Sequence, residues 1–211
     1  MPQNTPQRGR TRRIGAVAVA TVLVVFGLAA AVQGLDGRST VRSALELEGV
    51  VGQPQMTPTA IAAKARQAGL HGVAMPTCSV AGKPVDDGAG ARCFAEYMRI
   101  DALLATGGRT YAQMPRFATA DGTGTDDAAL AQTLPNGQPV NNPARNVWVT
   151  ETALSTALNT SYMAEQISLF GIAVGGAFLL VGLAFGLVAL GGVRVPSLAF
   201  ARRRAPEGAM S

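Results

Sequence analysis

Two cysteines are the residues in this sequence whose spacing points to a definite chemistry. Cys78 and Cys93 are the only cysteines among 211 residues, and a bond between them closes a loop of 16 residues, both cysteines included. The CxxC spacing that places two thiols at one helix end is absent, so thiol oxidoreductase chemistry is not supported. In an oxidising compartment the pair is expected to form a structural disulfide, which would contribute about 3 kcal/mol to stability.

The other side chains that could catalyse a reaction or bind a metal match no recognisable pattern. His71 is the only histidine, which excludes a multi-histidine zinc site within one chain. The acidic residues that lie among glycines lack the D-x-D-x-D-G spacing of a calcium loop; they are Asp86, Asp87, Asp121, Asp126 and Asp127. The glycine-rich stretches lack a P-loop lysine. We therefore expect no catalytic residue, no metal site and no cofactor, and we predict that the chain is not an enzyme.

Charge is segregated along the chain, and this segregation predicts a topology. Residues 1–13 hold four arginines and no acid, and residues 194–211 hold four arginines and one glutamate, so these two tails together carry +7. Residues 33–166 hold ten Lys or Arg against twelve Asp or Glu, a net charge of −2. The basic tails are expected on the cytoplasmic side of a membrane and the middle region on the opposite side. Because the middle region is mildly acidic, we expect no nucleic-acid partner.

Two apolar segments separate these regions. Residues 14–32 would span about 28 Å as a helix, which crosses the hydrocarbon core of a bilayer. We interpret this segment as a retained anchor, although Ala29 and Ala31 also provide an A-x-A-like site for cleavage of a signal peptide. Residues 166–193 contain no charge and must span. The predicted organisation is a cytoplasmic tail (1–13), a transmembrane helix (14–32), an extracytoplasmic domain (33–166), a second transmembrane helix (167–193) and a cytoplasmic tail (194–211).

Glycines recur in the second apolar segment at the spacing of helix-packing motifs. Gly171 with Gly175, and Gly182 with Gly186, form two GxxxG pairs against which another helix can pack closely. Three partners are open: the first apolar segment, a second copy of the chain, or another membrane protein. Glycine is also common in membrane helices that have no such packing role, and both interpretations stay open at this point.

The middle region is predicted to be mainly helical. A short helix is expected to begin at Thr57, a second is expected over residues 91–105, and a third is expected from Thr125, whose side chain could cap it. In residues 36–55 the apolar residues recur at neither helical nor strand spacing, and only residues 49–52 are predicted to form a short strand.

The last helix is predicted to run from the outer domain into the membrane without a break. No glycine or proline occurs between Pro143 and Gly171, so one helix of about 45 residues and roughly 70 Å is expected. The apolar positions of the 91–105 helix and of this last helix are Phe94, Met98, Leu104, Val147, Leu154, Leu158 and Ile167.

Residues 142–166, which read NPARNVWVTETALSTALNTSYMAEQ, resemble the corresponding run in a group of uncharacterised two-span membrane proteins of high-GC Gram-positive bacteria. The resemblance covers about the last third of the chain and implies a location in the membrane. It carries over no activity, because the ring-opening dioxygenase chemistry attributed to some proteins of this kind needs histidine ligands for iron, and this chain has only His71.

Two functions fit these predictions. The first is a non-catalytic interaction or accessory subunit of the cell envelope, which contacts membrane lipids and uses the glycine face of residues 167–193 to bind a membrane-protein partner or a second copy. The alternative is an extracytoplasmic sensor or ligand-binding domain, whose short tails would require a separate signalling partner. The fold expected in both cases is mainly α, with two transmembrane helices that flank a small helical, disulfide-linked extracytoplasmic domain.

Overall fold

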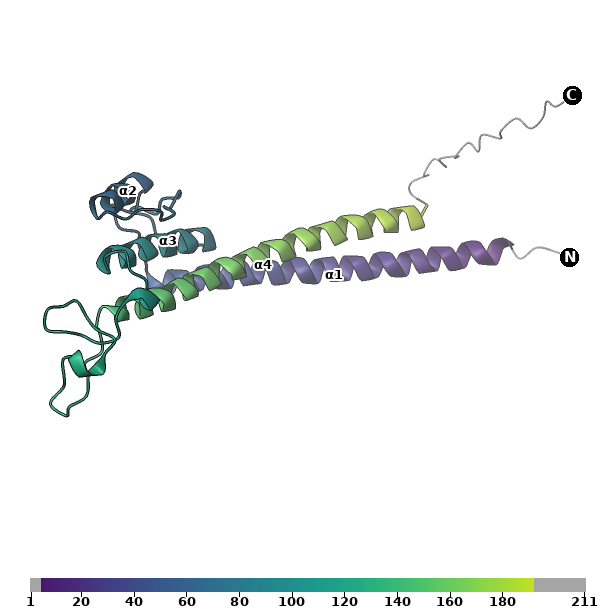
Figure 1. Ribbon diagram of the computed structural model, residues 1–211. Coiled ribbons are helices and arrows are strands. Elements are labelled where there is room, and N and C mark those ends of the chain that lie inside the picture. Colours follow the sequence, from purple (N-terminus) through teal and green to yellow (C-terminus); the bar gives the residue numbers. More distant parts are fainter. Residues whose placement is uncertain (1–4, 192–211) are drawn as a thin grey trace, which may run out of the picture. The chain divides into compact units, whose positions relative to one another are not determined.

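The computed structural model describes residues 5–191, which are mainly helical, as predicted (Figure 1). The elements in chain order are α1 (Thr5–Glu48), α2 (Pro58–Gln67), α3 (Gly88–Ala105), the 3-10 helices η1 (Tyr111–Gln113) and η2 (Ala128–Leu130), and α4 (Arg145–Ala189). Within these residues no β-strand forms, and β pairing is limited to isolated bridges. Of the predicted tails, residues 1–4 and 194–211 lie outside the described residues.

The chain divides into two compact units. The first unit contains the described residues up to Ala31 and from Ala173 onward, and these are segments of α1 and α4. The second unit is Val32–Ile172, which we call the disulfide-linked unit; it contains the remainder of both long helices and all elements between them. Both α1 and α4 are long and apolar enough to cross a membrane. Their most apolar windows are only 11% buried within the chain, so most of this apolar surface is free to contact lipid.

Helix α1 continues beyond the predicted transmembrane segment, residues 14–32, and ends at Glu48. Leu45 in its last turns is buried in the disulfide-linked unit, and this packing stabilises a stretch whose sequence has no clear helical period. Gly49 follows with φ of 60°, the left-handed conformation that ends helices and favours glycine. In place of a strand at 49–52, isolated bridges join this segment to the loop before α3.

Helices α2 and α3 begin at capping residues. The Thr57 hydroxyl accepts a hydrogen bond from the backbone N–H of Ala60 at 3.3 Å, and Pro58 occupies the first turn, as the sequence predicts. At the start of α3 the Asp87 carboxylate accepts from the N–H of Gly90 at 2.6 Å. The two predicted helices are therefore present, and they pack against one another.

The helix expected from Thr125 is instead the single 3-10 turn η2. Its cap is Asp127, whose carboxylate accepts from the N–H of Ala129 at 2.9 Å, while the Thr125 hydroxyl accepts from the N–H of Asp127. No residue of η2 is buried, so no packing offsets the cost of nucleating a longer helix.

Helix α4 is one continuous helix of 45 residues, as the absence of Gly and Pro before Gly171 predicts. Its first turn is anchored by Trp148, which is 4% exposed and whose indole N–H donates to the carbonyl of Arg109 at 2.9 Å. This tertiary contact keeps the valine-rich start of the helix helical, although β-branched residues lower helix propensity.

The hydrophobic core of the disulfide-linked unit is built around α3. The largest fully buried side chains are Tyr97, Ile100 and Val85. The main core cluster consists of Met56, Ile61, Val80, Cys93, Tyr97, Ile100, Ala102, Leu103, Met114 and Trp148. The core therefore joins α2, α3, the loops before, between and after them, and the first turn of α4.

Candidate functional site

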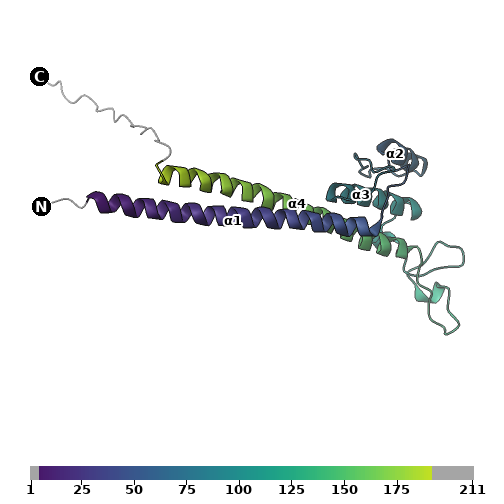
Figure 2. The ribbon, with the colours of Figure 1, turned by 180° about the vertical axis from the view of Figure 1, so that it is seen from behind.

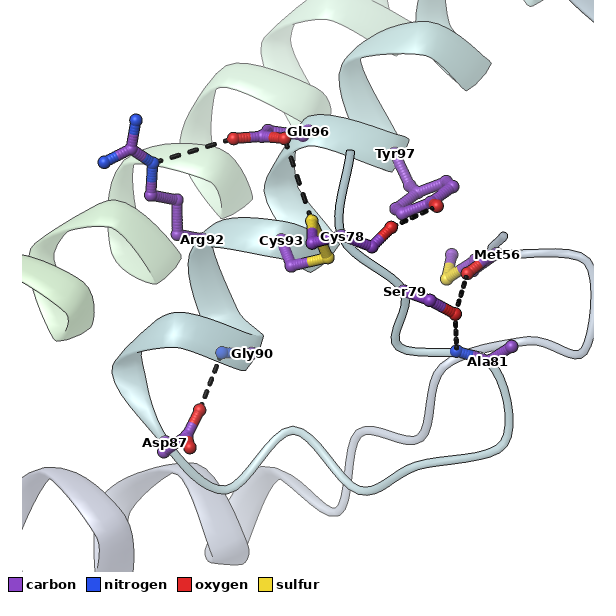
Figure 3. The surroundings of a disulfide bond; sticks show 10 residues. All are labelled: Met56, Cys78, Ser79, Ala81, Asp87, Gly90, Arg92, Cys93, Glu96 and Tyr97. Atoms are coloured by element: carbon purple, nitrogen blue, oxygen red, sulfur yellow. Dashed lines mark hydrogen bonds and ion pairs between the residues drawn. A yellow bond between two sulfur atoms is a disulfide. The ribbon is translucent and has the colours of Figure 1, made fainter. Parts of the chain in front are cut away.

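The predicted disulfide joins Cys78, in the loop before α3, to Cys93 on α3, and their Cα atoms are 6.0 Å apart (Figure 3). Cys93 is 5% exposed. Beside the bond, the Tyr97 hydroxyl donates to the Cys78 carbonyl at 2.7 Å, and the Ser79 hydroxyl donates to the Met56 carbonyl at 3.1 Å. Burial raises the pKa of Tyr97, which keeps its hydroxyl a neutral donor. The disulfide is thus part of the packed core and fixes the loop to α3.

In the first unit, glycines bring α1 and α4 into backbone contact. A Cβ atom added at Gly175 would lie 2.6 Å from the amide nitrogen of Ala31 and 2.7 Å from the carbonyl oxygen of Gly27. A Cβ added at Gly182 would lie 3.1 Å from the carbonyl oxygen of Ala20. Figures 1 and 2 show these two antiparallel segments side by side. Of the three partners that the sequence leaves open for this glycine face, the one that occupies it here is the first apolar segment of the same chain.

The small residues at this contact recur every seven residues, whereas the sequence suggested a spacing of four. In the first unit the buried small residues of the repeat are Gly175, Gly182 and Ala189 on α4, and Ala20 and Gly27 on α1; along the sequence the repeat continues into the disulfide-linked unit with Ser168 and Gly34. Gly186 makes an ordinary contact, since an added Cβ would lie 3.8 Å from the Cβ of Ala20, and Gly171 is half-buried. A seven-residue repeat is typical of left-handed helix pairs, and GxxxG is typical of right-handed pairs. Gly27 and Gly34 were missed in the sequence, and this repeat is the signal that could have found them.

In the disulfide-linked unit a buried carboxylate joins α1, α3 and α4. Glu165 on α4 is 6% exposed. Its Oε2 accepts from the backbone N–H of Gly88, the first residue of α3, at 2.6 Å, and its Oε1 accepts from Nε of Arg38 on α1 at 3.0 Å. The helix N-terminus and the guanidinium together offset the desolvation of the carboxylate. Gly88 suits this position because a Cβ atom added there would lie 2.8 Å from the Cα of Tyr162, which is too close for two carbon atoms that are not bonded.

The disulfide-linked unit also contains a large cavity, which residues of α1, α3 and α4 line. Its volume is about 1090 Å³, at the upper end of the range for small-molecule sites. Most of its wall is apolar and includes Leu45, Phe94, Met98, Val147, Leu154 and Leu158.

Helix α3 explains why this cavity is apolar. Tyr97, Ile100 and Leu103 on one side of the helix are buried in the core. Phe94 and Met98 lie on another side, where they line the cavity. Helix α3 therefore carries apolar residues on two faces, and the chain itself fully covers only one of them.

Three carboxylates interrupt the apolar wall: Glu48 at the end of α1, Asp101 on α3 and Glu151 on α4. Burial raises the pKa of Asp101, and the positive charge of Lys64 on α2 opposes this change. Glu151 is 6% exposed and accepts hydrogen bonds from the hydroxyls of its neighbours on α4.

A smaller, polar cavity of about 370 Å³ is lined in part by Glu151 as well. Arg92 and Arg99 of α3 line it together with hydroxyl-bearing residues of α4. Each guanidinium lies over an aromatic ring, Arg92 at 4.9 Å from the centroid of Tyr162 and Arg99 at 5.5 Å from that of Trp148.

The remaining residues that the sequence singled out lie apart from the cavities. His71 is exposed. Asp86 accepts from Arg42 at 2.9 Å, and Asp126 lies 3.4 Å from Nε of Arg116. Hydrogen bonds from the hydroxyl of Thr119 and from Thr123 lower the pKa of Asp121. Within residues 5–191 no group of three His, Cys, Asp or Glu side chains could hold a metal ion.

Comparison with protein families, with curated proteins and with solved structures finds no match for the chain. The resemblance of residues 142–166 to two-span membrane proteins stays a prediction.

Proposed function

We propose that the protein is a non-catalytic, membrane-anchored binding protein whose disulfide-linked unit takes an apolar small molecule into its cavity. In this proposal α1 and α4 cross the plasma membrane, both tails are cytoplasmic, and the disulfide-linked unit lies outside the cytoplasm. In this proposal a separate signalling partner reads the bound state.

The observation that carries the proposal is the cavity itself. Its apolar wall leaves side chains such as Phe94 and Leu154 without full cover from the chain, and a cavity of about 1090 Å³ has room for a drug-sized ligand. Exclusion of water from this wall by an apolar ligand would stabilise the complex by about 25 cal/mol for each Å² of apolar surface that is covered.

The disulfide and the charge pattern support an extracytoplasmic location. Disulfides persist in oxidising compartments and are rare in the cytoplasm, and Cys78 and Cys93 are bonded. The arginine excess of residues 1–13 and 194–211 favours a cytoplasmic position for both tails.

The glycine face no longer argues for an interaction subunit. Gly175 and Gly182 contact α1 of the same chain, so their spacing is accounted for without a partner. A binding role is therefore preferred to the accessory-subunit role that the sequence first suggested.

A neutral alkyl probe that carries a diazirine tests the proposal in the full chain reconstituted in nanodiscs. Labelling should map by mass spectrometry to the cavity wall around Phe94 and Met98. Ala157 lines the cavity and is exposed, so Ala157→Trp should narrow the cavity and reduce this labelling. Ala153 is an exposed alanine of α4 outside the cavity wall, so Ala153→Trp should leave it unchanged. Equal labelling of both variants and the wild type would refute the proposal.

A further inference from the structure

We infer that the ligand of the large cavity carries a positive charge on an otherwise apolar body, such as an alkyl or aryl amine or a quaternary ammonium. This inference rests on the proposed binding function and specifies the chemical class of its ligand. It follows from the charges that line the cavity and from an unbalanced carboxylate in its wall.

The charged side chains of the cavity wall are all acidic. Glu48, Asp101 and Glu151 line it, and among the described side chains no Lys, Arg or His does so. An apolar wall with charge of one sign is complementary to a ligand with charge of the opposite sign.

Glu151 lacks the positive partner that its burial requires. A comparison with Glu165 on the same helix shows the difference, because both side chains belong to residues that are 6% exposed. Glu165 pairs with Arg38 and with the N-terminus of α3. Glu151 accepts hydrogen bonds from the hydroxyls of Ser155 at 2.9 Å and Thr152 at 3.3 Å, and in the part of the chain that is described it forms no ion pair.

A buried carboxylate without a cation is costly, whereas one with a cation is tolerated. Glu151 lines the smaller, polar cavity together with Arg92 and Arg99, but neither arginine forms an ion pair with its carboxylate. Arg92 pairs with Glu96 at 3.6 Å and lies over Tyr162, and Arg99 lies over Trp148. A cationic group of the ligand in the large cavity would provide the missing partner for Glu151.

An organic cation fits the site better than a metal ion. The three carboxylates do not form a cluster that could hold a metal, and such a cluster is absent throughout residues 5–191. Most of the remaining wall is apolar, and it would contact an alkyl or aryl body. A ligand that carries an ammonium group on an alkyl or aryl body would pair with a carboxylate of the wall and also cover its apolar side chains.

The test uses three diazirine probes with the same octyl chain and different head groups: trimethylammonium, hydroxyl and sulfonate. The full chain is reconstituted in zwitterionic nanodiscs, and labelling of the cavity wall is normalised to labelling of the two apolar segments. The ammonium probe should label the wall about tenfold more than the sulfonate probe, the factor expected for one charge-assisted hydrogen bond.

Glu151→Gln keeps the size and hydrogen bonding of the side chain and removes its charge. In this variant the ratio of ammonium labelling to sulfonate labelling should fall towards one, whereas labelling by the hydroxyl probe should not change. Unchanged labelling by the hydroxyl probe also shows that the domain is folded. Glu46→Gln makes the same charge change at an exposed position outside the cavity wall and should keep the preference.

The outcomes separate the inference from the proposed function. If the hydroxyl probe labels the wall but the ammonium probe has no advantage over the sulfonate, the ligand is not a cation and the binding function stands. If the ammonium preference persists in Glu151→Gln, the charge is not recognised by this carboxylate and the inference is overturned. If no probe labels the wall, the binding function and the inference both fail.

Discussion

The Glu165 carboxylate accepts a hydrogen bond from the backbone N–H of Gly88 at 2.6 Å, across 77 positions of sequence. Through this bond a residue of α4 occupies the N-terminus of α3, and Arg38 of α1 pairs with the same carboxylate. One side chain thereby ties together the three helices that line the large cavity.

Glu165→Ala should lower the free energy of unfolding of the disulfide-linked unit by about 1–3 kcal/mol, because the Gly88 N–H would be left buried without an acceptor. Urea denaturation followed by the fluorescence of Trp148, the single tryptophan, measures the change. Glu96→Ala breaks an exposed pair with Arg92 and should cost less than about 1 kcal/mol. Equal costs for both variants would show that the Glu165 contact is not stabilising.

The disulfide should be fully formed in the native protein and should contribute about 3 kcal/mol to stability. Replacement of both Cys78 and Cys93 by alanine removes it without leaving a free thiol, and the same denaturation experiment measures the loss. Alkylation before unfolding should detect no free thiol in the wild type. Quantitative alkylation of the native, unreduced chain would contradict this assignment.

The close approach of the two apolar segments should be detectable as a cross-link within one chain. A Cβ added at Gly186 lies 3.8 Å from the Cβ of Ala20, the mean separation in disulfides, so Ala20→Cys with Gly186→Cys should form a bond on oxidation. Gly175→Leu adds a side chain against α1 backbone and should reduce the yield severalfold.

Gly176→Leu is the matched control for this cross-link, because an added Cβ there meets no atom within 4 Å. It should leave the yield unchanged. Oxidation that produces cross-linked dimers in place of a modified monomer would mean that the glycine face binds a second copy.

The topology predicts which positions an impermeant maleimide can reach in intact cells. Asn136→Cys, in an exposed loop of the disulfide-linked unit, should react before lysis. Cysteines at Gln3 or Ser211, which lie outside the described residues, should react only after lysis. Reaction of either tail in intact cells would reverse the assignment.

Hydrophobic pattern and capping chemistry were enough to predict most of the helices. Thr57 and Pro58 mark the start of α2, and the lack of breakers after Pro143 marks the continuous α4. These signals are local, so they can be read without knowledge of the tertiary structure. The extension of α1 to Glu48 was not predicted, because it depends on the tertiary contacts of Leu45 in the disulfide-linked unit.

Gly34 illustrates the limit of local reasoning. A glycine within a helix lowers helix propensity, yet here an added Cβ would lie 2.5 Å from the carbonyl oxygen of Ser168, so the residue permits a close contact with α4. The large cavity was not predicted for the same reason. Phe94, Met98, Val147, Leu154 and Leu158 were recognised as apolar positions, but their sequence pattern is the same whether they face a core or an empty volume.

The central claim is that the cavity of the disulfide-linked unit holds an apolar ligand, and native mass spectrometry of the full chain purified from membranes in mild detergent tests it most directly. We expect a small molecule bound at one copy per chain in the wild type and in Ala153→Trp, and a lower occupancy in Ala157→Trp. A wild-type chain that carries nothing beyond what Ala157→Trp carries would contradict the claim.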